Sequence, residues 1–322
     1  MDYTLEEIAK RIKSATRVLI TSHMRPDGDA YGSALALCYA LKKVGVEAEV
    51  CVESDMPANL AFVDGIKSVM KKPQKEYDLF VAVDCSDEQR LGLLSEEFFL
   101  AKRKKIDTVN IDHHVSNTRF AKYNFVRPCA ANCMNIATLI TYLGASFDKK
   151  VAEYLMLGLM TDSGNFSHDD VDEECFWLAA KLTAAGVDVR YYHYNLFKKQ
   201  SKARAALYAR TMSKIRYYFE DRFAAIIITQ DMMKDCDADQ SMTEGFVDFP
   251  LNVDSVEVAA SLMEVKKGQY RISLRSKEYA DVNKIAGVYG GGGHVRAAGC
   301  MLFGDLEEVL DKLSYTVSQY LE

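Results

Sequence analysis

Four short stretches of the chain place aspartates and histidines directly after apolar runs. They read "SHMRPDGDAYGS" at 22–33, "AVDCSD" at 82–87, "NIDHHVSN" at 110–117 and "GLMTDSGNF" at 158–166. A single aspartate at the end of a strand is usually a turn or capping residue. The first stretch alone does not distinguish a turn from a metal site. Pro26-Asp27-Gly28-Asp29 is a typical turn sequence, and Asp29 is a reasonable N-cap for the helix that follows.

Taken together, the four stretches supply a candidate ligand set for two divalent cations. Its members are His23, Asp27, Asp29, Asp84, His113 and Asp162. Four carboxylates facing one another are costly to keep ionised without a cation. Mixed carboxylate and imidazole ligation without thiolate suits Mn²⁺, with Mg²⁺, Co²⁺ or Fe²⁺ as substitutes. Paired metals about 3.5 to 4 Å apart are a device for phosphoryl transfer, so the set indicates phosphoester chemistry.

The elements that must position these residues alternate over the first half of the chain. Strands are expected at 17–21, 48–52, 79–84 and 108–112, with a helix from about 30 to 44 and helical pattern from 149 to 186. This alternation predicts an α/β domain with a mostly parallel sheet and helices on both faces. In such sheets, sites form beyond the carboxyl ends of the strands, where the acidic stretches fall.

The second half has a different character. Strands are expected within 215–229, with a hairpin turn near Glu220 and Asp221, and at 256–265 and 269–276, before a last helix at 306–322. We therefore predict a catalytic domain at 1–187, a connector at 188–212 and a smaller α+β domain at 213–322. The run "GGGG" at 290–293 predicts either a flexible hairpin or a loop that offers backbone N–H groups to a phosphate, with His294 as a further donor.

Composition limits the partners and the compartment. The net charge of −6 gives no global basic field for holding a long polyanion, so a nucleic-acid substrate should be short. No apolar run approaches the roughly 18 residues of a membrane span, and the N-terminal residues lack the pattern of a signal peptide. The eight cysteines show no metal-site spacing and are read as small hydrophobes in a reducing compartment. A cytoplasmic protein is expected, with no membrane partner.

The four stretches, in this order, resemble the four motifs of the DHH phosphoesterases. The later "GGGGHVRAAG" at 290–299 resembles the glycine and histidine motif of the DHH-associated domain. Length and the absence of extra modules favour the stand-alone type, similar to bacterial oligoribonucleases (nanoRNases) that also act on 3′-phosphoadenosine 5′-phosphate. The resemblance implies a Mn²⁺-dependent hydrolase that releases nucleoside monophosphates from very short RNA.

The resemblance also implies roles for individual residues. His23 and Asp27 would hold one Mn²⁺, Asp29, His113 and Asp162 the other, and Asp84 would bridge them, with metal-activated hydroxide attacking phosphorus. His114 would contact the scissile phosphate, and Asp112 would orient a histidine. Substrate binding would fall to the DHH-associated domain through Arg275, Gly291, Gly292, Gly293 and His294.

Two alternatives to the oligoribonuclease hypothesis remain. One keeps the chemistry but changes the substrate to cyclic di-AMP or its linear dinucleotide. The other is a non-catalytic binding module built on the same fold, against which the intact ligand set argues. Cys133 and Asn135 stand where family members often carry a small hydroxyl residue and a glutamate, which affects the assignment of substrate only. Assembly into a homodimer is left open.

Overall fold

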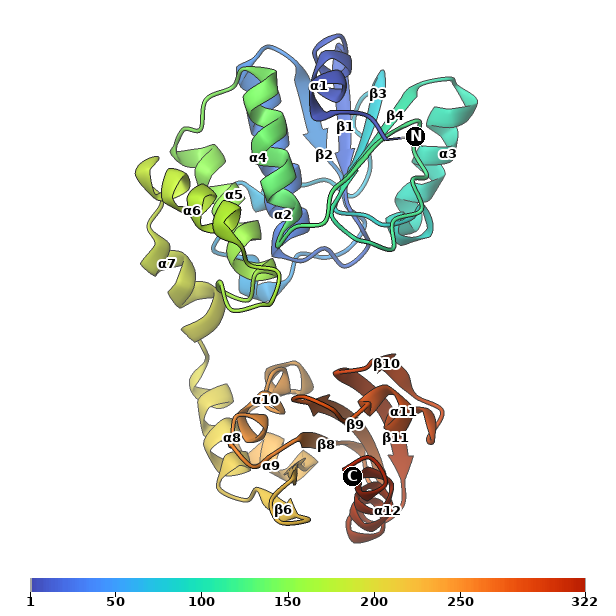
Figure 1. Cartoon of the computed structure of the whole chain (residues 1–322), viewed down its shortest axis with the longest axis vertical. Coiled ribbons are helices and arrows are strands. Elements are labelled where there is room, and N and C mark those ends of the chain that lie inside the picture. Colours follow the sequence, from blue (N-terminus) through green and yellow to red (C-terminus); the bar gives the residue numbers. More distant parts are fainter. Residues whose placement is uncertain (1, 322) are drawn as a thin grey trace. The chain divides into compact units, whose positions relative to one another are not determined.

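A computed structural model describes residues 2–321, which fall into two compact units on either side of the bond between Lys199 and Gln200 (Figure 1). The predicted connector, 188–212, is largely helical. It contains α7 (Val189–His193), the single π-turn η4 (Tyr194–Lys198) and α8 (Lys202–Met212). Asp188 and Ser201 cap α7 and α8 with their side chains, so a helix begins on each side of the boundary.

The first unit is built on a five-stranded sheet in which all pairs are parallel, as predicted. The order is β2-β1-β3-β4-β5, with bounds β1 (Arg17–Thr21), β2 (Glu47–Val50), β3 (Leu79–Val83), β4 (Asp107–Asp112) and β5 (Tyr123–Val126). The edge strand β5 was not predicted from the sequence. Since the strands are parallel, the carboxyl ends of β1, β3 and β4 lie at one edge of the sheet.

Helices cover both faces of this sheet, which confirms the predicted layering. Alternate strand residues such as Ile20 and Val81 join a core with α1 (Leu5–Lys13), α2 (Gly28–Lys43), α4 (Asn132–Leu143) and α5 (Lys149–Asp162). Residues of opposite parity, among them Leu19 and Phe80, pack with α3 (Ser95–Arg103) and the 3₁₀ turn η3 (Gln89–Leu94). Helix α6 (Glu173–Ala184) lies beside α5, and the 3₁₀ turns η1 (Ala58–Leu60) and η2 (Ile66–Ser68) lie between β2 and β3.

The helix after β1 begins differently from the prediction. Asp27, not Asp29, is the N-cap of α2, and its Oδ1 accepts hydrogen bonds from the backbone N–H groups of Asp29 and Ala30, both at 3.0 Å. Asp27 has the extended backbone that an N-cap requires, whereas Asp29 lies within the first turn. Asp29 is thereby freed for other contacts and is fully buried.

Helices α2 and α5 approach each other closely because glycines line their contact. A Cβ on Gly32 would lie 2.5 Å from the carbonyl oxygen of Tyr154, and one on Gly158 would lie 2.4 Å from Oδ1 of Asp29. Both distances are shorter than side chains tolerate. The close crossing holds the first turn of α2 against the C-terminal half of α5.

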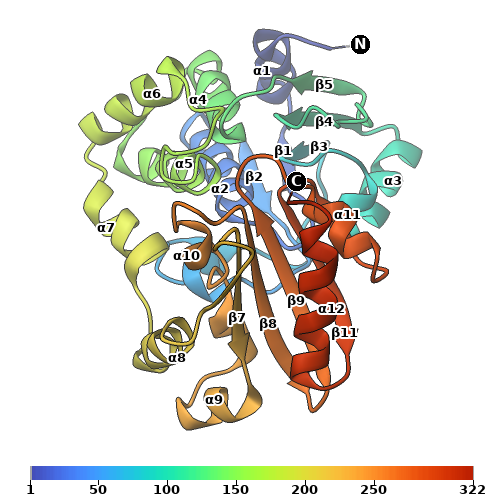
Figure 2. The same cartoon turned by 60° about the horizontal axis from the view of Figure 1, so that its bottom comes forward.

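The second unit contains a six-stranded mixed sheet in the order β10-β11-β9-β8-β7-β6, in which only β7 and β8 pair in parallel. The bounds are β6 (Arg216–Tyr218), β7 (Phe223–Ile228), β8 (Val258–Lys266), β9 (Gln269–Ser276), β10 (Gly292–His294) and β11 (Ala297–Phe303). Helices α11 (Val282–Gly287) and α12 (Leu306–Ser318) cover one face (Figure 2). The opposite face carries α8, α9 (Gln230–Asp235) and α10 (Asp248–Leu251).

The predicted turns of this unit are confirmed. Phe219, Glu220 and Asp221 are all left-handed and join β6 to β7, and the two expected strands β8 and β9 pair antiparallel. Over residues 2–321, no helix combines the length and the hydropathy that crossing a bilayer needs.

Candidate metal centre

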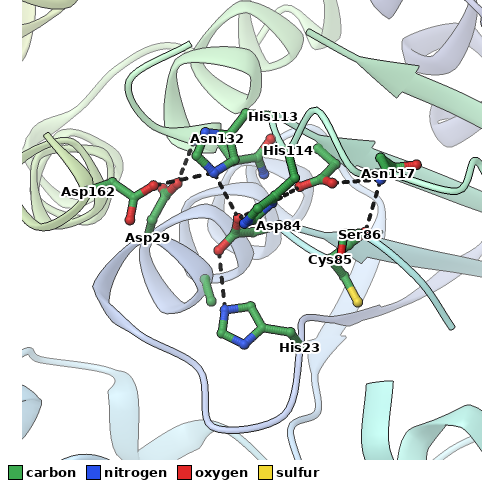
Figure 3. A network of polar contacts seen from close by, with 12 residues as sticks. His23, Asp29, Asp84, Cys85, Ser86, His113, His114, Asn117, Asn132 and Asp162 are labelled. Carbon is green, nitrogen blue, oxygen red and sulfur yellow. Dashed lines mark hydrogen bonds and ion pairs between the residues drawn. The ribbon is translucent and has the colours of Figure 1, made fainter. Parts of the chain in front are cut away.

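The loop after β1 with the first turn of α2, the loops after β3 and β4, and the C-terminal end of α5 bring the six predicted ligand residues together. Figure 3 labels His23, Asp29, Asp84, His113 and Asp162 among them. His23 follows β1 by two residues, and Asp84 directly follows β3. His113 directly follows β4, and Asp162 is the last residue of α5. The six side chains therefore reach one region from four separate segments of the first unit.

The first group of possible ligands contains His23, Asp27 and Asp84. Nε2 of His23 lies 3.5 Å from Oδ2 of Asp84 and 3.8 Å from Oδ2 of Asp27. One ligand atom from each of the three residues lies within 4.8 Å of the others, which a single cation can span.

A second group contains Asp29, His113 and Asp162, and a third contains Asp84, Asp112, His113 and His114. Nε2 of His113 lies 3.3 Å from Oδ2 of Asp162 and 3.4 Å from Oδ1 of Asp84. Asp84 thus faces the histidine of each group with a different oxygen, His23 through Oδ2 and His113 through Oδ1. A carboxylate that bridges two cations needs this placement.

Backbone carbonyls fix the two histidine rings. Nδ1 of His23 lies 2.8 Å from the carbonyl oxygen of Met24, and Nδ1 of His113 lies 2.8 Å from that of Cys129. Since a carbonyl only accepts, Nδ1 carries the proton in both rings. When the rings are neutral, as metal binding requires, each Nε2 carries the lone pair and faces the carboxylates.

Asp84 provides the structural test of whether a cation fits. Its backbone is left-handed, with φ of 52°, and its side chain is 2% exposed. Among residues 2–321, its buried Oδ1 finds no hydrogen-bond donor. A strained backbone and an unpartnered buried carboxylate oxygen are both costly in a purely structural residue. The donor set is oxygen and imidazole nitrogen, so these residues fit a pair of divalent cations.

Asp29 is anchored by the N-terminus of α4. The backbone N–H of Asn132 donates to Oδ2 of Asp29, and the backbone N–H of Cys133 donates to Oδ1 at 3.0 Å. The Ser33 hydroxyl donates to the same Oδ1 at 3.2 Å. The helix dipole favours a carboxylate at this position. Asp29 is thus held rigidly beside the centre.

The charges of the centre are unbalanced without a cation. Burial raises the pKa of Asp162 to about 9, together with the neighbouring charges of Asp29 and Asp84, and burial and the Asp84 charge raise the pKa of Asp29 to about 7. Burial opposes the charged form of His113 as well, but its close contact with Asp84 and the nearby charge of Asp29 raise its pKa to about 10. Protons therefore replace cations in the metal-free centre, and cation binding must displace them.

His114 differs from the other two histidines. Its Nδ1 lies 2.8 Å from Oδ1 of Asp112, a residue that is fully buried, and the His114 side chain is 32% exposed. The second oxygen of Asp112 accepts a hydrogen bond of 2.6 Å from the side-chain amide of Asn117. Both oxygens of Asp112 are engaged, and Nε2 of His114 is left without a partner among the described residues. The orienting role of Asp112 stays a prediction.

The predicted substrate residues all lie in the second unit. Arg275 is on β9, Gly291 precedes β10, and Gly292, Gly293 and His294 form β10. In the sheet register, His294 pairs with Ala297 and Ala297 pairs with Arg275. Paired residues send their side chains to the same face, so His294 and Arg275 flank β11 on one face, about 10 Å apart. Nε of Arg275 lies 3.7 Å from Oδ1 of Asp248 on α10.

The glycine run leaves fewer backbone N–H groups free for a phosphate than predicted. The N–H groups of Gly290, Gly291 and Gly293 donate to Gly287, Ala286 and Asn283, respectively. A Cβ on Gly291 or Gly293 would lie within 2.4 Å of a backbone carbonyl oxygen of β11, so both glycines permit a close approach of strands. A Cβ on Gly292 would meet only Oδ1 of Asn283, at 3.6 Å. Gly292 is therefore the one position of the three predicted glycines at which the fold tolerates a side chain.

The residue that departs from the family pattern at 135 has a structural explanation. Oδ1 of Asn135 accepts a hydrogen bond of 2.9 Å from Nε of Arg127, and Nδ2 of Asn135 lies 3.3 Å from the carbonyl oxygen of Asp112. Arg127 finds its counter-ion in Glu174 on α6, at 2.7 Å. Because Glu174 already pairs with Arg127, the neutral Asn135 leaves the charge of Arg127 balanced.

Sequence reasoning missed several residues that shape the centre. Asn117 and Gly158 lie inside the quoted stretches, but residue type and spacing gave no reason to select them. The carbonyl of Cys129 and the N–H of Asn132 carry no signal in the sequence, because any residue supplies a backbone group. These contacts appear only when β5 and α4 pack against the centre.

Comparisons with known proteins cover both units. The model described as the DHH family, N-terminal domain, matches residues 17–159, and the DHHA1 domain matches residues 224–322. A Thermus thermophilus relative named bifunctional oligoribonuclease and PAP phosphatase NrnA is 30% identical over 319 residues, 98% of this chain and 93% of the relative.

Two further similarities concern the metal and the fold. A Streptococcus mutans relative named probable manganese-dependent inorganic pyrophosphatase is 25% identical over 193 residues, 57% of this chain and 60% of the relative. The crystal structure of an exopolyphosphatase-related protein from Bacteroides fragilis is similar with a TM-score of 0.86 and 25% identity, covering 98% of this chain and 96% of that chain.

Proposed function

Because the chain belongs to the DHH family and ends in a DHHA1 domain, we propose that it is a metal-dependent phosphoesterase with two related activities. It hydrolyses very short RNA oligonucleotides to nucleoside monophosphates, and 3′-phosphoadenosine 5′-phosphate to AMP. The observation that carries the proposal is the position of Asp84, which belongs to one group of possible ligands and contacts His113 of another, while its Oδ1 finds no hydrogen-bond donor among the described residues. The name of the Thermus thermophilus relative combines the same two activities.

The proposed ligands follow the two groups. His23 and Asp27 would hold one cation, Asp29, His113 and Asp162 would hold the other, and Asp84, which contacts a histidine of each group, would bind both. Bound divalent cations supply Lewis acidity toward phosphoryl oxygens and lower the pKa of water. Mn²⁺ is the proposed metal, supported by the oxygen and imidazole donors and by the name of the pyrophosphatase relative.

The residues around the ligands have their own tasks. His114 presents Nε2, from which it donates a hydrogen bond to a phosphoryl oxygen or a proton to the leaving oxygen. Asp112 accepts the Nδ1–H of His114 and stabilises the imidazolium form. The rigid anchoring of Asp29 by α4 reduces the reorganisation that would otherwise accompany substrate binding.

We propose that the second unit binds the substrate. Arg275 and His294 lie on the same face of the sheet, where a guanidinium and an imidazole both suit phosphate. Gly292 keeps the surface of β10 free of side-chain atoms. The net charge of −6 supports a preference for short substrates over long nucleic acid. The cytoplasmic location and the domain boundaries at 187 and 212 stay predictions.

The test compares hydrolysis of 5′-labelled RNA dimers to pentamers, 3′-phosphoadenosine 5′-phosphate and cyclic di-AMP by the Mn²⁺-loaded protein. We expect the short RNAs and the adenosine bisphosphate to be cleaved, and His114→Ala to lower kcat by about 10² or more with both metals retained. Preferential cleavage of cyclic di-AMP by orders of magnitude would overturn the substrate assignment. Unchanged hydrolysis in both Asp84→Ala and His114→Ala would contradict the site assignment.

A further inference from the structure

A continuous series of hydrogen bonds runs from His114 through Asp112 to Asn117, a residue that has no role in the proposed function above. Oδ2 of Asp112 accepts a hydrogen bond of 2.6 Å from Nδ2 of Asn117, while Oδ1 of the same carboxylate faces Nδ1 of His114 at 2.8 Å. Figure 3 labels His114 and Asn117, the two ends of this series of contacts. Asn117 is 7% exposed. The series therefore runs through buried groups, where hydrogen bonds are strong and unpaired groups are costly.

The orientation of the Asn117 amide is fixed on both sides. Its Oδ1 accepts a hydrogen bond of 2.7 Å from the backbone N–H of Arg119. Its Nδ2 also lies 2.8 Å from Oδ1 of Asn110. Because the NH₂ group must face acceptors and the oxygen must face a donor, the amide has only one orientation that satisfies these contacts.

Backbone contacts hold Asn117 in place. Its own N–H donates to the carbonyl oxygen of His114 at 3.1 Å, which closes the loop after β4. The following residue, Thr118, donates its N–H to the carbonyl oxygen of Ser86 at 2.8 Å. The loop that carries Asn117 is thus tied to the loop that follows Asp84.

We propose that Asn117 is a positioning residue for the proposed hydrolysis, acting on His114 through Asp112. It holds the Asp112 carboxylate at the one angle from which Oδ1 receives Nδ1–H of His114, and so aims Nε2 of His114 at the substrate. Without Asn117, the Asp112 carboxylate is free to rotate about its Cβ–Cγ bond, and the His114 ring loses its fixed orientation. This inference rests on the proposed function, in which His114 contacts the scissile phosphate.

Asn117→Ala and Asn117→Ser, assayed on an RNA dimer with Mn²⁺, test the proposal. We expect Asn117→Ala to lower kcat by about 10- to 100-fold, the usual scale for a residue that orients a functional group, with KM and bound Mn²⁺ unchanged. Asn117→Ser keeps a hydroxyl donor and should recover part of kcat. A matched control is Asn124→Ala, since Asn124 is also a buried asparagine, 2% exposed, that bonds a loop of the same unit through Ala121. It should lose stability and keep kcat.

A double variant separates positioning from a general structural effect. If Asn117 acts through His114, adding Asn117→Ala to His114→Ala should change kcat by less than about twofold, because the group being positioned is already absent. The full single-variant loss in the His114→Ala background, or wild-type kcat in Asn117→Ala, would overturn the inference. If the wild-type protein hydrolyses no phosphoester, the proposed function fails instead.

Discussion

The glycine at the crossing of α2 and α5 allows a sharp test of how the fold positions a ligand. In Gly158→Ala, the new Cβ would lie 2.4 Å from Oδ1 of Asp29 and 3.1 Å from the Cβ of Cys133. Ordinary contact begins at 3.4 Å, so the Asp29 carboxylate must move from 2.4 to 3.4 Å, by about 1 Å. It is also bound to α4, so the movement breaks its contacts with the N–H groups of Asn132 and Cys133.

The effects on stability and on function should differ in size. Overpacking costs about 1 to 3 kcal/mol, and replacing glycine by alanine in a helix returns about 1 kcal/mol. The unfolding free energy of Gly158→Ala should therefore fall by only about 0 to 2 kcal/mol. A misplacement of about 1 Å in a positioned group can lower activity about 10²-fold. We expect weaker Mn²⁺ binding and about a 10²-fold loss of kcat in a folded protein.

The assay combines denaturant unfolding, calorimetric titration with Mn²⁺ and hydrolysis of an RNA dimer. Gly287→Ala is the matched control, because Gly287 is also helical and nothing lies within 4 Å of a Cβ there. It should gain up to about 1 kcal/mol of stability with unchanged Mn²⁺ affinity. Wild-type Mn²⁺ affinity and kcat in Gly158→Ala would refute the reasoning that the α2–α5 contact sets the position of Asp29.

Three further predictions follow from the site and from the second unit. The pKa values of Asp29 and Asp162 are raised from 3.8 to about 7 and about 9, so the folded, metal-free protein holds protons that the unfolded chain has lost, and its stability should fall as pH rises from about 4 to 9. Thermal unfolding across this range should show that slope, and Mn²⁺ should reduce it; a metal-free protein that becomes more stable with pH would contradict the assignment. Gly292→Ala should fold as the wild type and raise KM for an RNA dimer, whereas Gly293→Ala, whose Cβ would meet the carbonyl oxygen of Ala297 at 2.4 Å, should also lower the melting temperature. Arg275→Ala should raise KM about tenfold or more with unchanged Mn²⁺ content, since a charge-assisted hydrogen bond contributes about 1.5 to 3 kcal/mol, and an unchanged KM would remove Arg275 from the substrate site.

Much of the first unit could be predicted from the sequence because its signals are local. Each buried parallel strand is a short apolar run, and polar residues that include histidines and aspartates lie at or beyond the ends of three of them. The topology then brings these ends to one edge, so proximity of Asp84 and His113 followed from the strand pattern alone. The strand β5 was missed because "YNFV" is only four residues long and gains its strand character from pairing with β4.

The remaining features depend on tertiary contacts that leave no periodic signal. Asp27 and Asp29 are equally good capping residues, and only the backbone at Asp27 decides between them. The glycine run was expected to present free N–H groups, but Ala286, Gly287 and Asn283 accept three of them within the fold. The hydrogen bonds from Asn117 through Asp112 to His114 likewise form only because the loop after β4 folds back on itself.

A crystal structure of the Mn²⁺-soaked protein tests most directly whether one cluster of six side chains holds two cations. Anomalous diffraction at the manganese edge should show two peaks, one among His23, Asp27 and Asp84 and one among Asp84, Asp29, His113 and Asp162. In the Asp84→Ala variant, both peaks should be absent or weak because Mn²⁺ binds poorly. A single peak, or strong peaks away from Asp84, would contradict the assignment of a two-metal phosphoesterase centre.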